Sequence, residues 1–591
     1  MQPVDFTTLA AACSELRADW SPARCEQVYQ RDRTTLCLAL RTLKQRGWLT
    51  LSWHPQAARI HIGEPPPRIP DTFTFSQQLK HQLNGLALTA INAIAPWERT
   101  LDLQFARRPG DPPSWHLYVE IMGKYSNVIL TTADNQIVTV AHQVSEKQSS
   151  VRPLQTGQPY RTPPALTGPF ANLDESQDRW RERISLIPGP LKRMMLSSYS
   201  GLSSALVHAL IEAADLDPDQ STESLSASDW RRLFDHWRTW LGALADESFQ
   251  AGWRQDGYTV LGWGMTTPAA NVQQLLNDYY SDQLNRQEFS RLKHQLSQKL
   301  RTLLVKLRVK LDVFESRLQQ SDQADQYRQQ ADLLMAYQHT WKPGMTAIIL
   351  PDFTTGEPVA IELTPDKTAV QTAQALYKHH QKLKRARQAV EPLMTEVQAD
   401  IRYLEQVEAS LLQIQTYETA EDVWAIADIR DELIQQGYLA DPKQRSATQR
   451  QAKPISFHRY RTPQGFELLI GRNNRQNDQL TSRLATDYDL WFHTQEIPGS
   501  HTLLRLEPGA IPSEADLQFA ADLTAYFSRA RQADQVPVVY TEPKHVYKPR
   551  GARPGMVIYK HERVLWGQPQ RASQYLAAQE RLQFRSAHDF N

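Results

Sequence analysis

The sequence contains little cysteine, and this scarcity limits both its compartment and its metal chemistry. Among 591 residues there are three cysteines, Cys13, Cys25 and Cys37, and no two of them form a C-x-x-C pair. This number and spacing exclude a disulfide framework and a thiolate zinc site. Isolated cysteines of this kind are typical of small buried hydrophobic residues in a reducing compartment.

Long apolar runs and an export signal are also missing. No segment approaches the ~18 consecutive apolar residues that read as a membrane span. The first twenty residues, MQPVDFTTLAAACSELRADW, lack a basic stretch followed by a long apolar one. We therefore expect a cytoplasmic protein that does not contact a membrane.

The motifs of common enzymes are absent as well. The sequence has no P-loop, no dinucleotide-binding glycine pattern, no H-E-x-x-H zinc motif and no G-x-S-x-G nucleophile motif. We therefore expect no catalytic residues, no metal and no cofactor. The net charge is only +1, so a nucleic-acid partner has to be inferred from where the cations cluster.

The length predicts about four domains, and the mean hydropathy of -0.54 favours extended helices with polar faces. Residues 1–165 predict an α+β domain, because strand-like alternation and turns surround two amphipathic helices near 5–18 and 75–84. The predicted strands cover residues 48–53, 58–62, 101–105, 116–120 and 127–132.

Residues 166–275 predict a helical, loop-rich region. Within residues 191–216, two helical segments flank a Ser-Gly-Leu-Ser turn, which favours a helix–hairpin–helix whose backbone N–H groups suit a phosphate. Ser203 stands where that motif usually has its second glycine, so an ordinary αα-hairpin is the alternative.

The strongest helical pattern lies in residues 276–337. Leucine and phenylalanine recur at spacings of 3-4-4 from Phe289 to Leu318, an 11-residue repeat of about 3.67 residues per turn that predicts a nearly straight helix pair. A second helix is expected near 367–415, bent or broken at Pro392. We therefore predict an antiparallel coiled-coil hairpin with a first arm at 276–337, a small β tip at 338–364 and a second arm at 365–420.

Each arm contains a stretch with many cations and no acid, at residues 289–311 and 378–390. A solvated helix face normally mixes the two signs to gain i,i+4 pairs, so these stretches favour contact with nucleic acid over a face that is merely soluble. The candidate cations are Arg291, Lys293, Lys299, Arg301, Lys382, Lys384 and Arg385.

After a connector and polar linker at 421–455, residues 456–575 predict an α/β module and residues 576–591 a tail. We expect strands near 488–493, 501–505, 537–540 and 556–559, and a helix at 513–533. Trp491 and Phe492 are core residues or a stacking platform for bases.

The loops of this module concentrate cations and histidines. From Lys544 to His561 there is no acid. Glycine lets a backbone approach closely, and Lys and Arg neutralise phosphates, so we expect RNA contact here and at the turn at 472–475. The candidate residues are Arg472, Arg475, His493, His501, Lys544, His545, Lys548, Arg550 and Arg553. The three histidines could instead hold a metal or tie loops together, although no carboxylate lies at an obvious ligand spacing.

Five segments resemble one known family. VEIMGKYSNVIL (119–130) is similar to the NFACT N-terminal domain, and IELTPDKTAVQTAQALYKHHQKLKRA (361–386) resembles the entry into the second arm of the same proteins. GRNNRQND (471–478), DLWFHTQEIPGSH (489–501) and KHVYKPRGARPGMVIY (544–559) resemble the NFACT-R domain. In order and coverage the whole chain resembles the RqcH/NEMF family of NFACT proteins, older members of which were called fibronectin-binding proteins.

The resemblance implies a ribosome-associated quality control factor rather than an enzyme. Such proteins bind stalled 50S subunits carrying peptidyl-tRNA, through 23S rRNA and a stalk-base protein. They recruit alanyl-tRNA and direct template-free alanine tailing of the nascent chain, while the ribosome performs peptidyl transfer. The tRNA-binding and tailing residues implied here are Asp5, Glu98, Arg99, Glu120 and Lys124.

The chain departs from the family pattern at one of these positions and beside another. Glu98 stands where the family has an aspartate before the arginine, and Phe6 replaces the glycine that usually follows Asp5. Two other functions stay open: a surface adhesin that binds fibronectin, and a metal-dependent nucleic-acid enzyme, because the NFACT N-terminal domain is thought to resemble the fold of certain DNA glycosylases.

Overall fold

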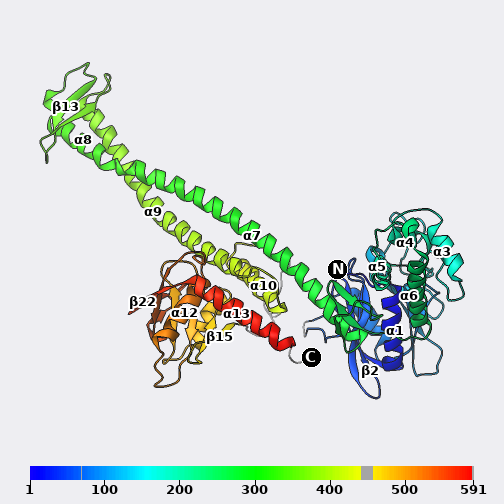
Figure 1. The fold of residues 1–591 in the computed structure, drawn as a ribbon. Helices are drawn as coiled ribbons and strands as arrows, with labels where there is room; N and C mark the ends of the chain where they lie inside the picture. Colours follow the sequence, from blue (N-terminus) through cyan, green and yellow to red (C-terminus); the bar gives the residue numbers. More distant parts are fainter. Residues whose placement is uncertain (68–69, 441–456, 589–591) are drawn as a thin grey trace. The chain divides into compact units, whose positions relative to one another are not determined.

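The computed structural model describes residues 1–67, 70–440 and 457–588 (Figure 1). The chain divides into two compact units, residues 1–284 and the residues from 285 onward. The linker predicted at 441–455 lies outside the described residues. The mixed α+β architecture that the sequence predicts is confirmed in both units.

The first unit is built on a nine-stranded antiparallel sheet in the order β4-β3-β2-β1-β5-β6-β7-β8-β9. The five strands predicted from alternation are confirmed. The others were missed: bulges near Cys25 and Gln30 interrupt the alternation of β1, and β2 is buried over nearly its whole length. The strands are β1 (Ala23–Asp32), β2 (Thr35–Arg41), β3 (Arg46–Ser52), β4 (Arg59–Gly63), β5 (Ala87–Ala93), β6 (Thr100–Ala106), β7 (Trp115–Glu120), β8 (Asn127–Thr132) and β9 (Ile137–Val140).

Two helices complete the sheet domain, α1 (Phe6–Trp20) and α2 (Thr74–Leu83). Helix α1 packs Leu9, Cys13 and Leu16 into the core beside the sheet. All three cysteines are buried and free, as their isolation in the sequence predicted, and burial raises the pKa of the Cys13 thiol to about 12.

The helical region follows with its own tryptophan-rich core, formed around Trp180, Trp230, Trp237 and Trp240. Its elements are η2 (Thr222–Ser224), α3 (Gln177–Ser185), α4 (Leu191–Ser198), α5 (Ser204–Ala213) and α6 (Ala227–Ala245), followed by the short strands β10 (Gly252–Arg254), β11 (Gly257–Thr259) and β12 (Thr267–Pro268). Helices α4 and α5 flank the predicted Ser-Gly-Leu-Ser turn, where Gly201 has a positive φ of 87°.

The coiled-coil arm consists of α7 (Val272–Asp322) and α9 (Ala369–Gln413), which run side by side in Figure 1. Leu296, Leu300 and Leu304 of α7 share a core with Val397 and Leu404 of α9. Pro392 lies inside α9 without breaking it. The far end carries α8 (Ala324–Ala336), η3 (Gln338–Thr340) and the predicted hairpin, β13 (Ala347–Pro351) paired with β14 (Pro358–Glu362).

At its base the arm continues into α10 (Ala420–Gln435), and the C-terminal module has a six-stranded sheet in the order β15-β16-β18-β17-β19-β22. Its strands are β15 (His458–Arg461), β16 (Glu467–Ile470), β17 (Leu490–Thr494), β18 (Thr502–Leu504), β19 (Val536–Thr541) and β22 (Arg563–Gly567). Trp491 and Phe492 are fully buried, so they belong to the core.

Helices cover one face of this sheet, namely α12 (Glu514–Tyr526) and α13 (Pro569–His588). The helix predicted at 513–533 ends at Tyr526, and α13 runs across the predicted boundary at 575. Small elements cover the other face: α11 (Asn474–Gln479), the π-turn η5 (Leu480–Leu484), η6 (Pro543–His545) and the ribbon of β20 (Val546–Tyr547) and β21 (Ile558–Tyr559).

Candidate nucleic-acid interface

Asp5 joins the start of two helices in the first unit. It is the N-cap of α1, where its Oδ1 accepts a hydrogen bond from the Thr8 N–H at 2.8 Å. Its Oδ2 accepts a hydrogen bond at 2.6 Å from the hydroxyl of Ser203, the N-cap of α5. Asp5 is only 8% exposed, so both carboxylate oxygens have protein partners.

Glu98 and Arg99 lie on the turn between β5 and β6. The preceding residue, Trp97, has a positive φ of 65°, a conformation that is strained for a bulky side chain. Its indole lies 4.9 Å from the Phe6 ring and 5.6 Å from the Trp240 ring, and these aromatic contacts hold the turn. Glu98 and Arg99 are half-buried, and neither side chain forms a hydrogen bond or ion pair within the described residues, so both are available to a ligand.

Glu120 and Lys124, only four residues apart, have opposite environments. Glu120 is 1% exposed, and its carboxylate pairs with the two terminal guanidinium nitrogens of Arg152 and accepts a hydrogen bond from Tyr160 at 2.9 Å. Lys124 is exposed on the 3-10 turn η1 (Gly123–Tyr125), with its ammonium 4.9 Å from the centre of the exposed Tyr125 ring. Glu120 therefore stabilises the fold through its buried partners, whereas Lys124 and Tyr125 face solvent. Tyr125 was not predicted, although its place beside a lysine, between the strands predicted at 116–120 and 127–132, was a usable signal.

In the second unit Arg472 points into the protein. Its guanidinium forms an ion pair with Asp422 of α10 and lies 3.5 Å from a Glu421 oxygen. Arg472 is 8% exposed and Asp422 5% exposed, so this predicted RNA contact is an internal ion pair. The expectation that Arg472 meets RNA is corrected by its burial, since a phosphate cannot reach it without opening the fold.

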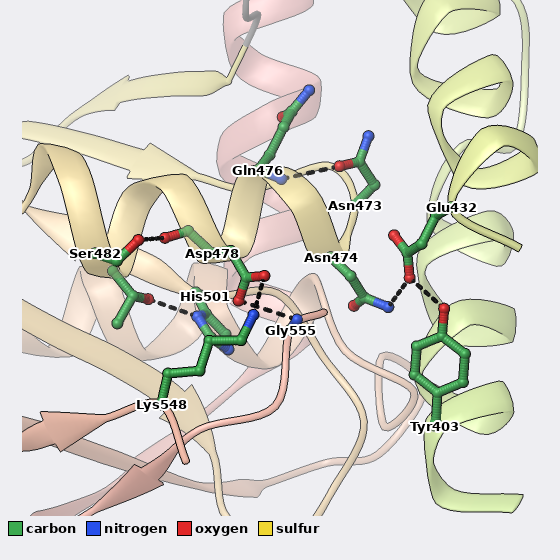
Figure 2. A network of polar contacts seen from close by, with 11 residues as sticks. Tyr403, Glu432, Asn473, Asn474, Gln476, Asp478, Ser482, His501, Lys548 and Gly555 are labelled. Atoms are coloured by element: carbon green, nitrogen blue, oxygen red, sulfur yellow. Dashed lines mark hydrogen bonds and ion pairs between the residues drawn. The ribbon is translucent and has the colours of Figure 1, made fainter. Parts of the chain in front are cut away.

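The same segment is fastened to the base of the arm (Figure 2). Glu432 of α10 accepts hydrogen bonds from the Tyr403 hydroxyl at 2.7 Å and from the Asn474 amide at 2.9 Å. Burial raises the pKa of the Glu432 carboxyl, against the opposing effect of those donors. Arg475 also bonds to the arm base, through the side-chain oxygen of Gln435. The GRNNRQND segment therefore holds the C-terminal module on α9 and α10.

Asp478 and Asp400 fix the basic loop that follows β20. Asp478 pairs with Lys548 and accepts a hydrogen bond from the Gly555 N–H at 3.1 Å (Figure 2). Arg553 pairs with Asp400 of α9 and lies 5.1 Å from the centre of the Tyr403 ring. The positive φ of 74° at Gly555 and its approach to Asn474 leave no space for a Cβ.

The three predicted histidines do not converge. His501 is 1% exposed, and its Nδ1 lies 2.7 Å from the Thr481 hydroxyl. Its ring packs 5.3 Å from that of His493, whereas His545 packs against His561 at 4.6 Å. Burial lowers the pKa of His493 to about 4 and that of His501 well below its ordinary value. Among residues 1–67, 70–440 and 457–588 no group of three or more His, Cys, Asp or Glu side chains could hold a metal ion.

Few of the cations predicted to contact RNA in the C-terminal module point freely outward. Arg550 is exposed and forms no ion pair in the described part of the chain. Lys544 and Lys548 are also exposed, although each has an acidic neighbour, Glu542 and Asp478. Exposed ion pairs are worth little, so these lysines can exchange their carboxylates for phosphates.

The arm presents more free cations than the loop. Lys299, Arg301, Lys382, Lys384 and Arg385 are exposed, and none of them forms an ion pair among the residues described. Two of the predicted set have protein partners. Arg291 pairs with Glu288, and Lys293 donates a hydrogen bond to the Gln415 carbonyl.

Comparisons with known proteins identify the class of this chain. A family profile described as "NFACT N-terminal and middle domains" matches residues 5–452, and one described as "NFACT protein RNA binding domain" matches residues 456–561. The chain therefore belongs to the NFACT family and carries its RNA-binding domain.

Within the NFACT family, the chain is similar to curated proteins that carry one name. The chain is 32% identical over 568 residues to "Rqc2 homolog RqcH" of Streptococcus pneumoniae serotype 2 (strain D39), covering 93% of this chain and 95% of that protein. It is 30% identical over 574 residues to "Rqc2 homolog RqcH" of Bacillus subtilis (strain 168), covering 94% and 96%. The solved C-terminal part of a fibronectin/fibrinogen-binding protein from Streptococcus suis is 31% identical, covers 48% of this chain and 95% of its own, and has a TM-score of 0.37.

The sequence matches confirm the predicted RqcH/NEMF family, and they support a role in ribosome-associated quality control together with RNA binding. No described helix combines the length and the apolar character that a bilayer crossing requires.

Proposed function

We propose that this protein binds obstructed 50S ribosomal subunits that carry peptidyl-tRNA, recruits alanyl-tRNA, and directs template-free addition of alanine to the C-terminus of the stalled chain in the cytoplasm. The ribosome performs the peptidyl transfer, so the protein itself supplies no catalytic group. The observation that carries the proposal is the RqcH similarity over 93% of the chain, which includes both NFACT domain types in order.

Arg99 is the side chain best suited to tRNA in the first unit. It is half-buried and unpaired, and the packed ring of Trp97 fixes its turn. A guanidinium held ready in this way loses little freedom when it meets a phosphate or a base edge. Glu98 keeps the negative charge of the family aspartate with one extra methylene, which changes its reach by about one C–C bond.

The RNA surface of the second unit consists of the exposed loop cations and the basic run of α9. Arg550, Lys544 and Lys548 lie on one loop, and Lys382 and Lys384 lie within a single turn of α9. Cations spaced along a rigid rod suit the phosphates of folded RNA, which is recognised mainly by shape and backbone. The 23S rRNA and a tRNA both offer such a backbone.

The test is to purify the protein with its bound particles, sequence the co-purifying tRNAs and quantify large subunits. We expect tRNA-Ala to be enriched and Arg99→Ala to lose tRNA while retaining 50S subunits. Arg107→Ala is the matched control, because Arg107 is an exposed arginine without an ion pair in the described chain. Equal tRNA recovery from Arg99→Ala and the control would contradict the assignment of Arg99, and the absence of 50S subunits from the wild-type sample would contradict the proposal as a whole.

A further inference from the structure

Helix α7 carries a row of exposed valines on the side opposite its packed face. Val305 is 53% exposed, Val309 58% and Val313 45%. At about 100° per residue, successive steps of four residues advance only about 40° around the helix, so these three side chains form one stripe. Leu300 and Leu304 pack on the other side of the helix, in the core shared with α9.

Valine is an unusual choice for a face that needs only to be soluble. Its branched Cβ disfavours the helix, and lysine, glutamate or glutamine would serve better on a solvated surface. Three valines in one row therefore combine a poor helix former with apolar surface left in water. Contiguous exposed apolar surface of this kind marks an interaction site.

The stripe has a border of one charge on one side. Lys299, Lys306 and Lys310 are exposed next to it, and none of the three forms an ion pair in the described part of the chain. Other arm cations are neutralised within the protein: Arg308 by Glu405 at 2.7 Å and Arg387 by Asp322 at 2.9 Å. The unpaired lysines are therefore complementary to an acidic partner.

The valines distinguish a protein partner from RNA. Sequence-tolerant binding of nucleic acid uses aromatic rings for stacking beside cations for phosphates, whereas methyl groups facing a phosphate backbone gain nothing. An antiparallel pairing with a second copy of this chain is disfavoured too, because it would set the lysines of one stripe against those of the other.

We infer that the surface formed by Val305, Val309, Val313, Lys299, Lys306 and Lys310 docks an acidic amphipathic helix of another protein. The partner's apolar residues, spaced three or four apart, cover the valines, and its Asp or Glu residues meet the lysines. This inference does not rest on the proposed tRNA and 50S contacts, because the proposed RNA surface uses the loop and α9, whereas this surface lies on α7 and binds a different class of partner.

The experiment places the photo-cross-linking residue p-benzoylphenylalanine at position 309 of the full-length protein in its host cells and maps the adduct by mass spectrometry. We expect a peptide from an acidic amphipathic helix, and a decrease in adduct of at least tenfold when Lys306→Glu and Lys310→Glu are added. The matched control, Lys342→Glu with Lys367→Glu, makes the same charge change at two exposed lysines elsewhere in the second unit and should leave the adduct unchanged. An adduct to RNA, an adduct to a second copy, no adduct, or insensitivity to the α7 reversals would overturn the inference.

The mapped helix is then synthesised and titrated into the purified protein. Val309→Asp should weaken its binding at least tenfold, whereas Val151→Asp, at a valine that is 72% exposed in the first unit, should not. Equal affinity for the two variants would overturn the assignment of the stripe. Thermal unfolding of both variants verifies that the fold is intact.

Discussion

Replacing Arg472 by alanine removes a guanidinium that is 8% exposed and leaves Asp422, 5% exposed, without its cation. Truncating one partner of a buried ion pair typically costs about 3–5 kcal/mol. Asp422 still accepts the backbone N–H groups of Glu418 and Thr419, both at 2.9 Å, so the lower end applies. We expect a loss of about 3 kcal/mol, which corresponds to about 5 °C in the unfolding temperature of a unit of about 300 residues.

Arg550→Ala provides the matched comparison, because both arginines were predicted to bind RNA. Arg550 is exposed and has no ion pair among the described residues, so its loss should change stability by less than about 0.5 kcal/mol. It should instead weaken binding to large-subunit RNA and reduce the dependence on salt by about one counterion. Urea unfolding and RNA binding at several salt concentrations measure the two effects.

The opposite pattern would refute this division of the basic residues. If Arg472→Ala unfolded like the wild type and lost RNA affinity, the internal pair with Asp422 would not describe the protein in solution. If Arg550→Ala bound RNA with wild-type affinity and the same salt dependence, the loop would not be part of the RNA surface.

Three further predictions follow from buried groups. Because burial raises the pKa of Glu432 above its ordinary 4.5, the free energy of unfolding should fall as pH rises from 4.5 through the folded pKa. Glu432→Gln should remove this fall, which urea unfolding across pH 4–8 measures. A constant difference between Glu432→Gln and the wild type over that range would contradict the prediction. Because burial lowers the pKa of His493 to about 4 from 6.5, the free energy of unfolding should fall as pH drops from 6.5 to 4. His493→Gln should flatten this slope in the same titration. An unchanged slope would contradict the lowered pKa of His493. Asp5→Ala removes the acceptor of the Ser203 hydroxyl and the Thr8 N–H, so it should lower the free energy of unfolding by about 1–3 kcal/mol. Asp5→Asn keeps an acceptor and should lower it less. Equal unfolding temperatures for the two variants and the wild type would exclude the capping role.

Much of the fold was predictable because its signals are local. The leucine spacing of α7 and the alternation of β6 through β8 each lie within one element, so a short window contains the whole pattern. Strand β2 was missed because Leu36, Leu38 and Leu40 alternate with Cys37 and Ala39, which are also apolar, so the run lacks the polar positions of a half-buried strand. Pro392 was expected either to bend α9 or to sit at a break, and the continuous helix excludes the break. Packing along the arm outweighs one lost hydrogen bond.

The site was harder to predict because a cation's partner need not be near it in sequence. Arg472 contacts Asp422, 50 residues away, and Arg553 contacts Asp400, 153 residues away. A local count of acids and bases registered the arginines as an unbalanced cluster and could not detect the distant carboxylates. The unpaired Arg550 and the half-buried, paired Arg553 look alike in the sequence, and only the tertiary structure distinguishes them.

The attachment of the C-terminal module to α9 has a mechanical consequence. The side-chain amide of Gln406 on α9 donates a hydrogen bond to the Gly499 carbonyl and accepts one from the Gly499 N–H. Arg553 forms an ion pair with Asp400, about two turns earlier on the same helix. The 45 residues of α9 span about 67 Å at 1.5 Å per residue. The contacts to the module therefore lie near one end of a long helix, where they can act as a pivot. Each degree of rotation between the module and α9 at this pivot moves the distant β13–β14 hairpin by about 1 Å. A small rotation at one end of the helix therefore becomes a displacement of molecular size at the other.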